Sequence, residues 1–454
     1  MAFKSVNPAN GNTHREVDAF TPRQQEAALQ ESAAAAGPWR DRAVGERAAL
    51  LRKAAEVLRK HLDEFAEIIT LEMGKPIREA RAEIEKCALV CDYYADEGPG
   101  FVADETIESD AGRSLVAWQP LGTVLAVMPW NFPFWQVFRF AAPTLVAGNT
   151  GLLKHASNVP MCALAIESVF REAGFPEGVF RTLMISSRQV AGVINDPRVH
   201  AVTLTGSESA GRQVAAAAGA KLKKSLLELG GSDPFIVLED ADLDLAVENA
   251  VASRFLNAGQ SCIAAKRLIL VEAIADDFMR RFRTAVDALV VGDPMEEATQ
   301  IGPLARFDLR DDLHQQVVES MSAGAVAVTG CSPEGGAGAW YQPSILDHVK
   351  PAMRAYHEEL FGPVAIVIRA RDEADAVRIA NDSDFGLGGS VWTMDSERGE
   401  RVARRLECGC AFVNGMVKSD PRLPFGGVKH SGYGRELSRL GVREFMNAKT
   451  IWIR

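Results

Sequence analysis

The chain has 454 residues, enough for two or three folded domains. Hydrophobic residues make up 47% and charged residues 24%, close to the average of globular proteins, so the composition excludes a disordered or fibrous chain. Fifty Lys and Arg against sixty Asp and Glu give a net charge of -10 at pH 7, without the basic stripe that nucleic-acid binding needs. We therefore expect no nucleic-acid partner.

The sequence also argues against membrane insertion, secretion and metal binding. The longest apolar stretch, residues 121–130, contains Pro129 and has about half the length of a membrane span. The N-terminal segment lacks the apolar core of a signal peptide, so we expect a cytoplasmic protein. The seven cysteines and eight histidines are scattered, without CxxC, HxH or HxxxH spacing, and predict neither a disulfide framework nor a metal site.

The first third of the chain is predicted to be helical. Thr21 is a candidate N-cap, followed by proline and then by a glutamine at the third helical position, ahead of an Ala-rich run. Apolar residues recur at helical spacing over residues 46–73, and Gly74 ends that helix. A further helix is expected over residues 78–94, where two cysteines on one face are interpreted as packing residues.

From residue 114 onward, short β-rich runs alternate with helical segments. This alternation predicts a parallel, doubly wound sheet. It starts again after Gly231, so we expect two α/β lobes that meet near Gly230 and Gly231. The expected strands are residues 121–127, 150–153, 180–185, 201–205, 234–238, 266–271, 364–368, 390–392 and 411–413. The expected helices start near residues 134, 161, 189, 209, 242, 275, 373 and 396.

Two segments of the first lobe follow strands, at the edge where open α/β sheets bind ligands. In the segment MPWNFP, Asn131 lies between two prolines, and its amide can donate to a developing oxyanion; an Asn that only caps a turn is the alternative. Residues 205–211 (TGSESAG) join a strand to a helix whose N-terminal amides suit a pyrophosphate, although ordinary helix capping explains the same residues. This segment matches neither GxGxxG nor a P-loop.

Two further segments offer an acid and a thiol. Glu228 lies in an apolar strand ahead of two glycines, and apolar surroundings raise a carboxyl pKa as a general base requires; a structural Glu is the alternative. Cys262 closes the polar turn NAGQSC, just ahead of residues compatible with a helix. Because a helix N-terminus stabilises a thiolate, Cys262 is a candidate nucleophile, although most cysteines are inert core residues and that reading stays open here.

The last two segments are candidate ligand contacts. Residues 358–363 (EELFGP) put acids and Phe361 ahead of a Gly-Pro turn, where a carboxylate can bind ribose hydroxyls; an acid at a helix end is the alternative. Residues 424–436 contain a Gly-rich loop that either lines a substrate pocket or only turns the chain.

The motifs PWNFP, LELGG, GQSC, ELFGP and PFGG, in this order, resemble those of the aldehyde dehydrogenase superfamily, and most closely those of its short bacterial succinate-semialdehyde dehydrogenases. The resemblance implies an α/β fold with two doubly wound open-sheet lobes and a small β oligomerisation arm. The dinucleotide-binding domain is expected at residues 1–100 and 120–231, the catalytic domain at 232–444, and the arm and terminal strand at 101–119 and 445–454. An apolar edge strand of this kind is normally covered, which predicts a homodimer or homotetramer.

The resemblance also implies a mechanism. Cys262 matches the family nucleophile, which attacks an aldehyde to give a thiohemiacetal and then a thioester, while Asn131 and the Cys262 amide hold the oxyanion. Glu228 matches the base that activates water to hydrolyse the thioester to a carboxylic acid. Ala264 replaces a second cysteine found in some members, so we expect no local redox switch.

The cofactor that the resemblance implies is NADP or NAD. Members that prefer NAD usually carry a glutamate where this chain has Ser157, and its absence removes repulsion toward a 2′-phosphate, so we expect NADP to be preferred. The residues that the resemblance assigns to the cofactor are Trp130, Lys154, Ser157, Gly206, Ser207, Gly211, Leu229, Glu359 and Phe361.

The expected substrate is a small aldehyde with a distal carboxylate. Arg139 matches the position where semialdehyde-specific members bind that carboxylate; a salt bridge at an interface is the alternative. Trp135 is expected to wall the pocket and Ser419 to give a second contact. Some longer members carry an arginine where this chain has Leu256, and Arg254 lies two residues earlier. Whether a second arginine binds the substrate carboxylate therefore stays open. Succinate semialdehyde is the leading candidate, with glutarate semialdehyde and other ω-carboxy or small aliphatic aldehydes as alternatives.

Two rival functions remain at this point. A thioester hydrolase or acyltransferase would use Cys262 and Glu228 without redox chemistry, and would not need Lys154 or Glu359. A non-catalytic relative would have lost Cys262, Glu228 or Asn131, and all three are present.

Overall fold

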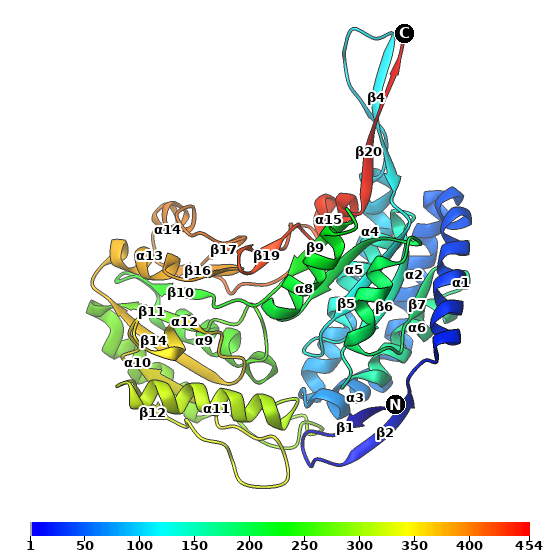
Figure 1. Cartoon of the computed structure of the whole chain (residues 1–454). Helices are drawn as coiled ribbons and strands as arrows, with labels where there is room; N and C mark the ends of the chain where they lie inside the picture. Colours follow the sequence, from blue (N-terminus) through cyan, green and yellow to red (C-terminus); the bar gives the residue numbers. More distant parts are fainter. Residues whose placement is uncertain (1) are drawn as a thin grey trace.

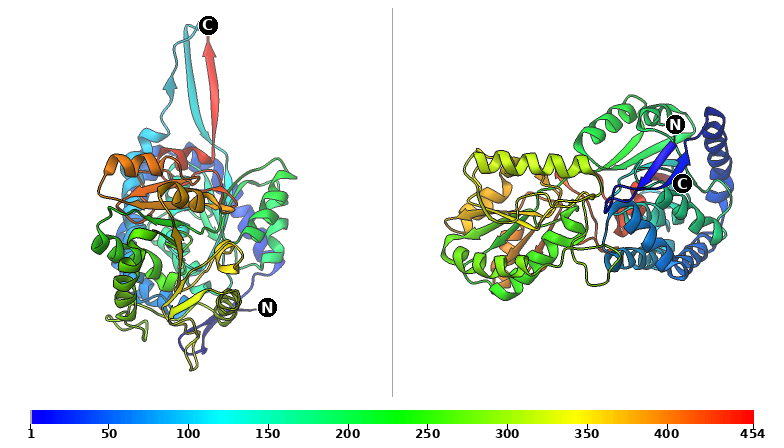
Figure 2. Two further views of the ribbon diagram at one scale, coloured as in Figure 1. Left: turned by 90° about the vertical axis from the view of Figure 1, so that its left-hand side faces the viewer. Right: turned by 90° about the horizontal axis from the view of Figure 1, so that it is seen from below.

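The computed structural model describes residues 2–454, which form two α/β lobes with a β arm projecting from the N-terminal lobe (Figure 1). The expected architecture of two open-sheet lobes is confirmed. The second view of the molecule shows that the arm extends well beyond both lobes and carries the C-terminus at its tip (Figure 2). Among residues 2–454, no helix has the length and apolar character needed to cross a membrane.

The N-terminal lobe is built on a six-stranded, mainly parallel sheet. Across the sheet the strands are β19 (Gly432–Tyr433), β9 (Lys224–Glu228), β8 (Val199–Thr205), β5 (Thr123–Met128), β6 (Thr150–His155) and β7 (Phe180–Thr182). The chain starts in the middle at β5, runs outward through β6 and β7, and returns to β8 on the other side of β5. The order of the strands therefore reverses between β5 and β8, which is where ligands bind in sheets of this kind.

Helices cover both faces of this sheet. The helices of the N-terminal lobe are α1 (Pro22–Asp41), α2 (Val44–Lys60), α3 (Leu62–Met73), α4 (Ile77–Phe101), α5 (Trp135–Val146), α6 (Pro160–Glu172), η1 (Ser187–Gln189), α7 (Val190–Asn195), α8 (Glu208–Gly219) and α15 (Ser438–Glu444). Every residue of α5 is buried, because this helix packs between the sheet and α2, α4 and α15. Because α5 is enclosed along its whole length, its side chains are held rigidly.

The C-terminal lobe is built on a seven-stranded sheet. Its strands, in order, are β12 (Val326–Thr329), β13 (Ser344–Asp347), β14 (Val364–Ala370), β11 (Arg267–Val271), β10 (Pro234–Val237), β16 (Gly388–Trp392) and β17 (Cys410–Val413). Only β12 runs antiparallel to its neighbour. The helices of this lobe are α9 (Leu243–Phe255), η2 (Leu256–Gly259), α10 (Glu272–Asp287), α11 (Phe307–Ser322), α12 (Arg354–His357), α13 (Glu373–Asn381) and α14 (Ser396–Ala403).

Three small sheets complete the fold. The arm consists of β3 (Glu105–Thr106), β4 (Arg113–Pro120) and β20 (Met446–Ile453), and β20 pairs with β4 along its whole length. The other two are the hairpin of β1 (Ala2–Val6) and β2 (Thr13–Asp18), and the pair of β15 (Phe385–Gly386) and β18 (Val428–Lys429). The N-terminal hairpin was not expected, because its second strand is polar throughout and carries no apolar alternation.

Most of the predicted elements are present, and the differences have local causes. Thr21 caps α1 with the expected capping box. The helix expected over residues 46–73 is two helices, α2 and α3, because the backbone leaves helical geometry at His61. Gly74 ends α3 in the left-handed region, as predicted. Residues 432–444 pair and pack with the N-terminal lobe through β19 and α15, so the sequence-based boundary at residue 444 does not follow the strand pairing.

Candidate active site

Two cavities meet at Cys262 between the lobes. One, of about 460 Å³, lies at the carboxyl ends of β5, β6 and β8, and we call it the strand-end cavity. The other, of about 200 Å³, is lined by α4, α5 and residues 416–419, and we call it the α4–α5 cavity. Cys262 and Gln136 line both, so ligands in the two cavities meet at one thiol.

The lobes contribute opposite edges of their sheets to the site. Asn131 and Ser207 follow β5 and β8, at the carboxyl ends of strands in the N-terminal lobe. Cys262 and Phe361 precede β11 and β14, at the amino ends of strands in the C-terminal lobe. The site therefore needs both lobes, and neither sheet alone supplies all of its groups.

Cys262 lies in a turn between η2 and β11. The expectation of a helix N-terminus here is wrong, because the next regular element is a strand. Three successive residues with positive φ, Asn257, Ala258 and Gly259, reverse the chain just before the thiol, and the Glu79 carboxylate accepts a hydrogen bond from the Asn257 N–H at 2.7 Å. Burial raises the pKa of the Cys262 thiol to about 12, while the nearby charges of Lys266 and Arg139 act in the opposite direction. Burial thus favours the neutral thiol, and neighbouring cations, not a helix dipole, act against it.

Asn131 is fixed beside the nucleophile turn. Its side-chain amide donates to the Gln260 carbonyl at 3.1 Å, and the Asn257 side chain donates to the Asn131 carbonyl at 2.7 Å. One N–H of the Asn131 amide remains for a ligand. The buried ring of His155 lies within 2.9 Å of the Pro133 carbonyl, and burial lowers its pKa to about 4, so the ring is neutral and holds the turn in place.

Glu228 lies at the end of β9, fully enclosed. Burial, reinforced by the negative charge of Glu436, raises its pKa to about 8, as expected for a candidate base. Its carboxyl faces Gly426, where a Cβ would lie 2.7 Å from its Oε1, and it lines neither cavity. Neither carboxyl oxygen has a hydrogen-bond partner among residues 2–454. The carboxyl is therefore held next to the site with a raised pKa, and it faces Gly426 instead of either cavity.

The residues assigned to the cofactor fall into three groups. Those that line the strand-end cavity are Trp130, Lys154, Gly206, Ser207, Leu229, Glu359 and Phe361. Ser157 is exposed and lines an adjoining cavity, which shares Lys154 and Arg306 with the strand-end cavity. Gly211 lies on α8 and lines no part of either: a Cβ there would come within 2.6 Å of the Leu229 side chain. The structure thus shows close packing of Gly211 against Leu229, which lines the strand-end cavity, and the assignment of Gly211 to the cofactor stays a prediction.

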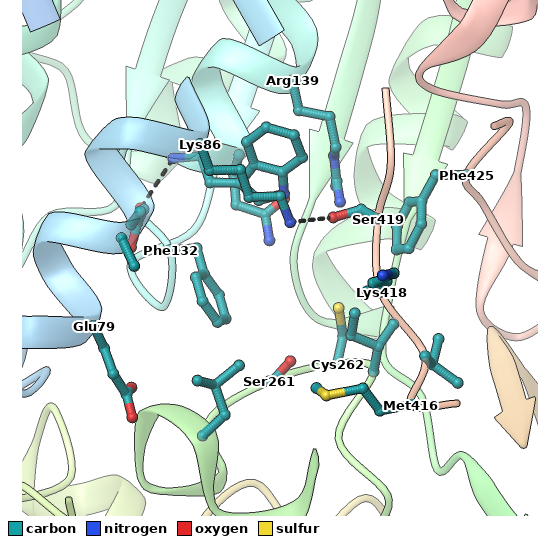
Figure 3. A pocket seen from close by; sticks show the side chains of 17 residues that line it. Glu79, Lys86, Phe132, Arg139, Ser261, Cys262, Met416, Lys418, Ser419 and Phe425 are labelled. Atoms are coloured by element: carbon teal, nitrogen blue, oxygen red, sulfur yellow. Dashed lines mark hydrogen bonds between the residues drawn. The ribbon is translucent and has the colours of Figure 1, made fainter. Parts of the chain in front are cut away.

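The α4–α5 cavity contains the three residues assigned to the substrate. Trp135, Arg139 and Ser419 all line it. Figure 3 shows Arg139 and Ser419 facing the same space as the Cys262 sulfur. Arg139 forms a buried ion pair with Glu436, and its guanidinium lies 4.7 Å from the centre of the Phe425 ring. Arg139 thus forms a salt bridge, as the alternative interpretation expected. Its side chain still lines the α4–α5 cavity.

Arg254 lies outside both cavities. It is completely buried and donates to the carbonyls of Val364 at 2.8 Å and Leu360 at 3.0 Å, and also to that of Gly362. These bonds tie the ELFGP segment to α9. Leu256, by contrast, does line the α4–α5 cavity. The arginine near the nucleophile is therefore structural and does not clamp a carboxylate.

Comparisons with known proteins agree with this geometry. The aldehyde dehydrogenase family profile matches residues 1–451. The chain belongs to the aldehyde dehydrogenase family. It is 51% identical, over the full length of both chains, to a probable succinate-semialdehyde dehydrogenase (NADP(+)) of Synechocystis sp.. It is 49% identical to a succinate semialdehyde dehydrogenase (NAD(P)+) of Escherichia coli, covering 99% of this chain and 97% of the relative.

Solved structures show the same fold. The succinic semialdehyde dehydrogenase of Streptococcus pyogenes, in complex with NADP+, superposes with a TM-score of 0.98 and 38% identity, covering both chains completely. The aldehyde dehydrogenase fold therefore extends over the whole of this chain.

Sequence reasoning missed two lysines of this aldehyde dehydrogenase. Lys266 is buried between the lobes, where its ammonium donates to the carbonyls of Ser261 at 2.6 Å and Cys262 at 2.9 Å and forms an ion pair with Glu359 at 3.0 Å. Lys86, on α4, lines the α4–α5 cavity and donates to Ser419. Neither lies in a recognised motif, and only the three-dimensional contacts bring them to the site.

Proposed function

We propose that this aldehyde dehydrogenase oxidises succinate semialdehyde to succinate, with NADP preferred over NAD. The observation that carries the proposal is the meeting of two cavities at Cys262: one has the lining of a dinucleotide site, and the other combines an apolar wall with cationic side chains. The similarity to the succinate-semialdehyde dehydrogenases of Synechocystis sp. and Escherichia coli supports this substrate and this class of cofactor.

The strand-end cavity fits a dinucleotide with a 2′-phosphate. The N-terminus of α8, capped by Ser207, borders it and provides unpaired backbone N–H groups for a pyrophosphate. Lys154 is buried beside the exposed Ser157, and both can bond a phosphate at the mouth. Glu359 is fixed by the Gly231 N–H at 3.1 Å and by Lys266, and can take ribose hydroxyls. NADP bound here would accept a hydride from the carbon that Cys262 has attacked.

The chain's own residues supply the remaining chemistry. Lys266 and Arg139 favour the Cys262 thiolate, which adds to the aldehyde carbon. The free N–H of Asn131 and the backbone N–H of Cys262 then stabilise the oxyanion of the thiohemiacetal. Loss of hydride leaves a thioester on Cys262, and Glu228 takes the proton of the water that hydrolyses it. For this last step the Glu228 carboxyl must turn from Gly426 toward the thiol.

The decisive experiment is a substrate and cofactor panel. Succinate semialdehyde, glutarate semialdehyde and butanal are assayed with NADP and with NAD by the absorbance of the reduced nicotinamide. We expect the highest kcat/KM for succinate semialdehyde with NADP. Cys262→Ala should abolish oxidation and leave dinucleotide binding intact, measured by quenching of tryptophan fluorescence. Thioester hydrolysis without reduction of either cofactor would contradict the proposal and favour the hydrolase.

The proposal extends to the cellular setting and the assembly. The reaction needs a reduced thiol and a dinucleotide, and reducing conditions of this kind are found in the cytoplasm. Exposed apolar side chains on the arm, Trp452 and Ile453, support a homodimer or homotetramer.

A further inference from the structure

We propose that Lys86, on α4, supplies the positive charge that binds the distal carboxylate of the substrate, with Ser419 completing the contact. Arg139 then acts as a positioning residue. The inference rests on the proposed function, because it assumes an ω-carboxy aldehyde in the α4–α5 cavity.

The charge of Arg139 is already neutralised within the protein. Its Nε pairs with the carboxylate of Glu436, and both side chains are almost completely buried. A second nitrogen lies 3.4 Å from the Thr205 hydroxyl, and the guanidinium faces the Phe425 ring. A substrate carboxylate would compete with Glu436 for this cation inside a low-dielectric region. Removing Glu436 from its partner leaves a buried, uncompensated charge, which is costly.

Lys86 has no such partner. Its ammonium donates to the Ser419 hydroxyl at 2.8 Å and lies 4.1 Å from the centre of the Trp135 ring, and the side chain takes part in no ion pair among residues 2–454 (Figure 3). An ammonium has three N–H donors, so the bond to Ser419 leaves two for a ligand.

The acids nearest to Lys86 are occupied elsewhere. Glu83 pairs with Lys75 and accepts the backbone N–H groups of Phe134 and Trp135 at 2.9 Å, which caps α5. Asp420 pairs with Arg422 at 2.6 Å. Within residues 2–454, Lys86 is therefore a partly buried cation of this cavity without an ion-pair partner, and Lys418 lies exposed at the rim.

The surroundings of Lys86 suit a short carbon chain that ends in an anion. The apolar side chains that line the cavity include Phe132, Trp135, Leu256, Ile263, Met416 and Phe425. In Figure 3 the Lys86–Ser419 pair lies on one side of this space, and the Cys262 sulfur points into it from another. Burial deprives the Lys86 ammonium of hydration. A substrate carboxylate next to it would offset that loss by forming an ion pair. The aldehyde end of the same molecule would then extend toward the thiol.

The test is Lys86→Met, which keeps an unbranched side chain and removes the charge. We compare kcat/KM with NADP for succinate semialdehyde and for butanal, which has four carbons but no carboxylate. We expect the value for succinate semialdehyde to fall about 30-fold, the order expected for one charged hydrogen bond, and that for butanal to stay the same. Lys86→Arg should restore part of the loss. The matched control is Lys53→Met, an exposed lysine on α2 outside both cavities.

The outcomes separate this inference from the proposed function. If the unmodified enzyme does not prefer succinate semialdehyde to butanal, the proposed function fails. If it does, and Lys86→Met keeps the full preference, the charge lies elsewhere and this inference alone is overturned. Unchanged butanal oxidation in Lys86→Met shows that the variant is folded. Arg139→Gln should lower kcat/KM for both aldehydes alike, since it leaves Glu436 unpaired beside Glu228. A loss confined to the semialdehyde would return the role to Arg139 and contradict the inference.

Discussion

Ser157 lies in the cavity that adjoins the strand-end cavity, where it leaves room for the 2′-phosphate of NADP. Lys154 is buried there and Ser157 is exposed three residues later, in the turn after β6. We expect Ser157→Glu to lower kcat/KM with NADP by about 10-fold or more, because two like charges a few ångströms apart repel in a partly desolvated site, and to affect NAD much less. Steady-state assays with both cofactors measure this. Ser157→Gln, which has the size of Glu without its charge, is the control, and an unchanged NADP/NAD ratio in Ser157→Glu would count against the cofactor assignment.

Lys86 also predicts how substrate choice depends on pH. Burial lowers its pKa to about 8, so the ammonium is charged below that pH and becomes neutral above it. The titratable and charged groups around it are Glu79, Glu83, Cys87, Arg139, Cys262, Lys418 and Asp420. We expect the ratio of kcat/KM for succinate semialdehyde to that for butanal to be constant between about pH 6 and pH 7, where the substrate carboxylate is ionised and Lys86 is charged, and to fall as pH rises through about 8.

The use of a ratio removes other titrations from this measurement. Glu228 also has a pKa of about 8, but it acts on both aldehydes and cancels. In Lys86→Met the ratio should be low at every pH. A ratio that falls with the same pH profile in that variant would show that another group titrates.

Single residues were predictable where chemistry depends on a local motif. The segments around Asn131 and Cys262 made them candidates, and the family resemblance assigned their roles. The structure places Cys262 where the two cavities meet and Asn131 in the strand-end cavity. Lys86 was missed because nothing in α4 marks it, and its bond to Ser419 spans 333 residues of chain. The helix expected after Cys262 was wrong because apolar residues in a short run are compatible with either a helix or a strand.

At the scale of elements, the site depends on short segments that hold one another. Arg254, at the end of α9, ties down the segment between α12 and β14 that carries Glu359 and Phe361. Lys266, just before β11, connects this segment to the nucleophile turn. The strands themselves were predicted well from apolar runs, whereas these side-chain bonds between loops leave no periodic signal in the sequence.

Arg254 gives a prediction about stability. We expect Arg254→Met to lower the free energy of unfolding by about 3 kcal/mol, because it leaves several buried carbonyls without donors, among them those of Leu360 and Val364. Denaturant unfolding measures the change. Arg401→Met, at an exposed position of α14, is the control and should be neutral. If Arg254→Met is as stable as the control but selectively loses activity toward succinate semialdehyde, Arg254 binds the carboxylate and the structural role is wrong.

At the scale of the whole molecule, the active site is a consequence of how two similar sheets face each other. The N-terminal lobe presents the carboxyl ends of its strands, and the C-terminal lobe presents the amino ends of β11 and β14. Sequence periodicity predicts both sheets, but not their mutual orientation, because that is set by contacts between segments far apart in the chain. The return of β19 and α15 to the N-terminal lobe was missed for the same reason.

The arm is the feature that predicts assembly. It consists of only three strands, one of them two residues long, and it projects from the body with Ile107, Trp452 and Ile453 about half exposed (Figure 2). A small sheet with an exposed apolar surface and a free edge at β20 is stable when another chain covers it. We expect sedimentation velocity to show a homodimer or homotetramer, and Trp452→Lys with Ile453→Lys to shift it to smaller species. Asn447→Lys, which adds a charge to an exposed polar position of the same strand, should leave the assembly intact. Monomers of the unmodified chain at micromolar concentration would contradict the prediction, whatever the activity of the enzyme.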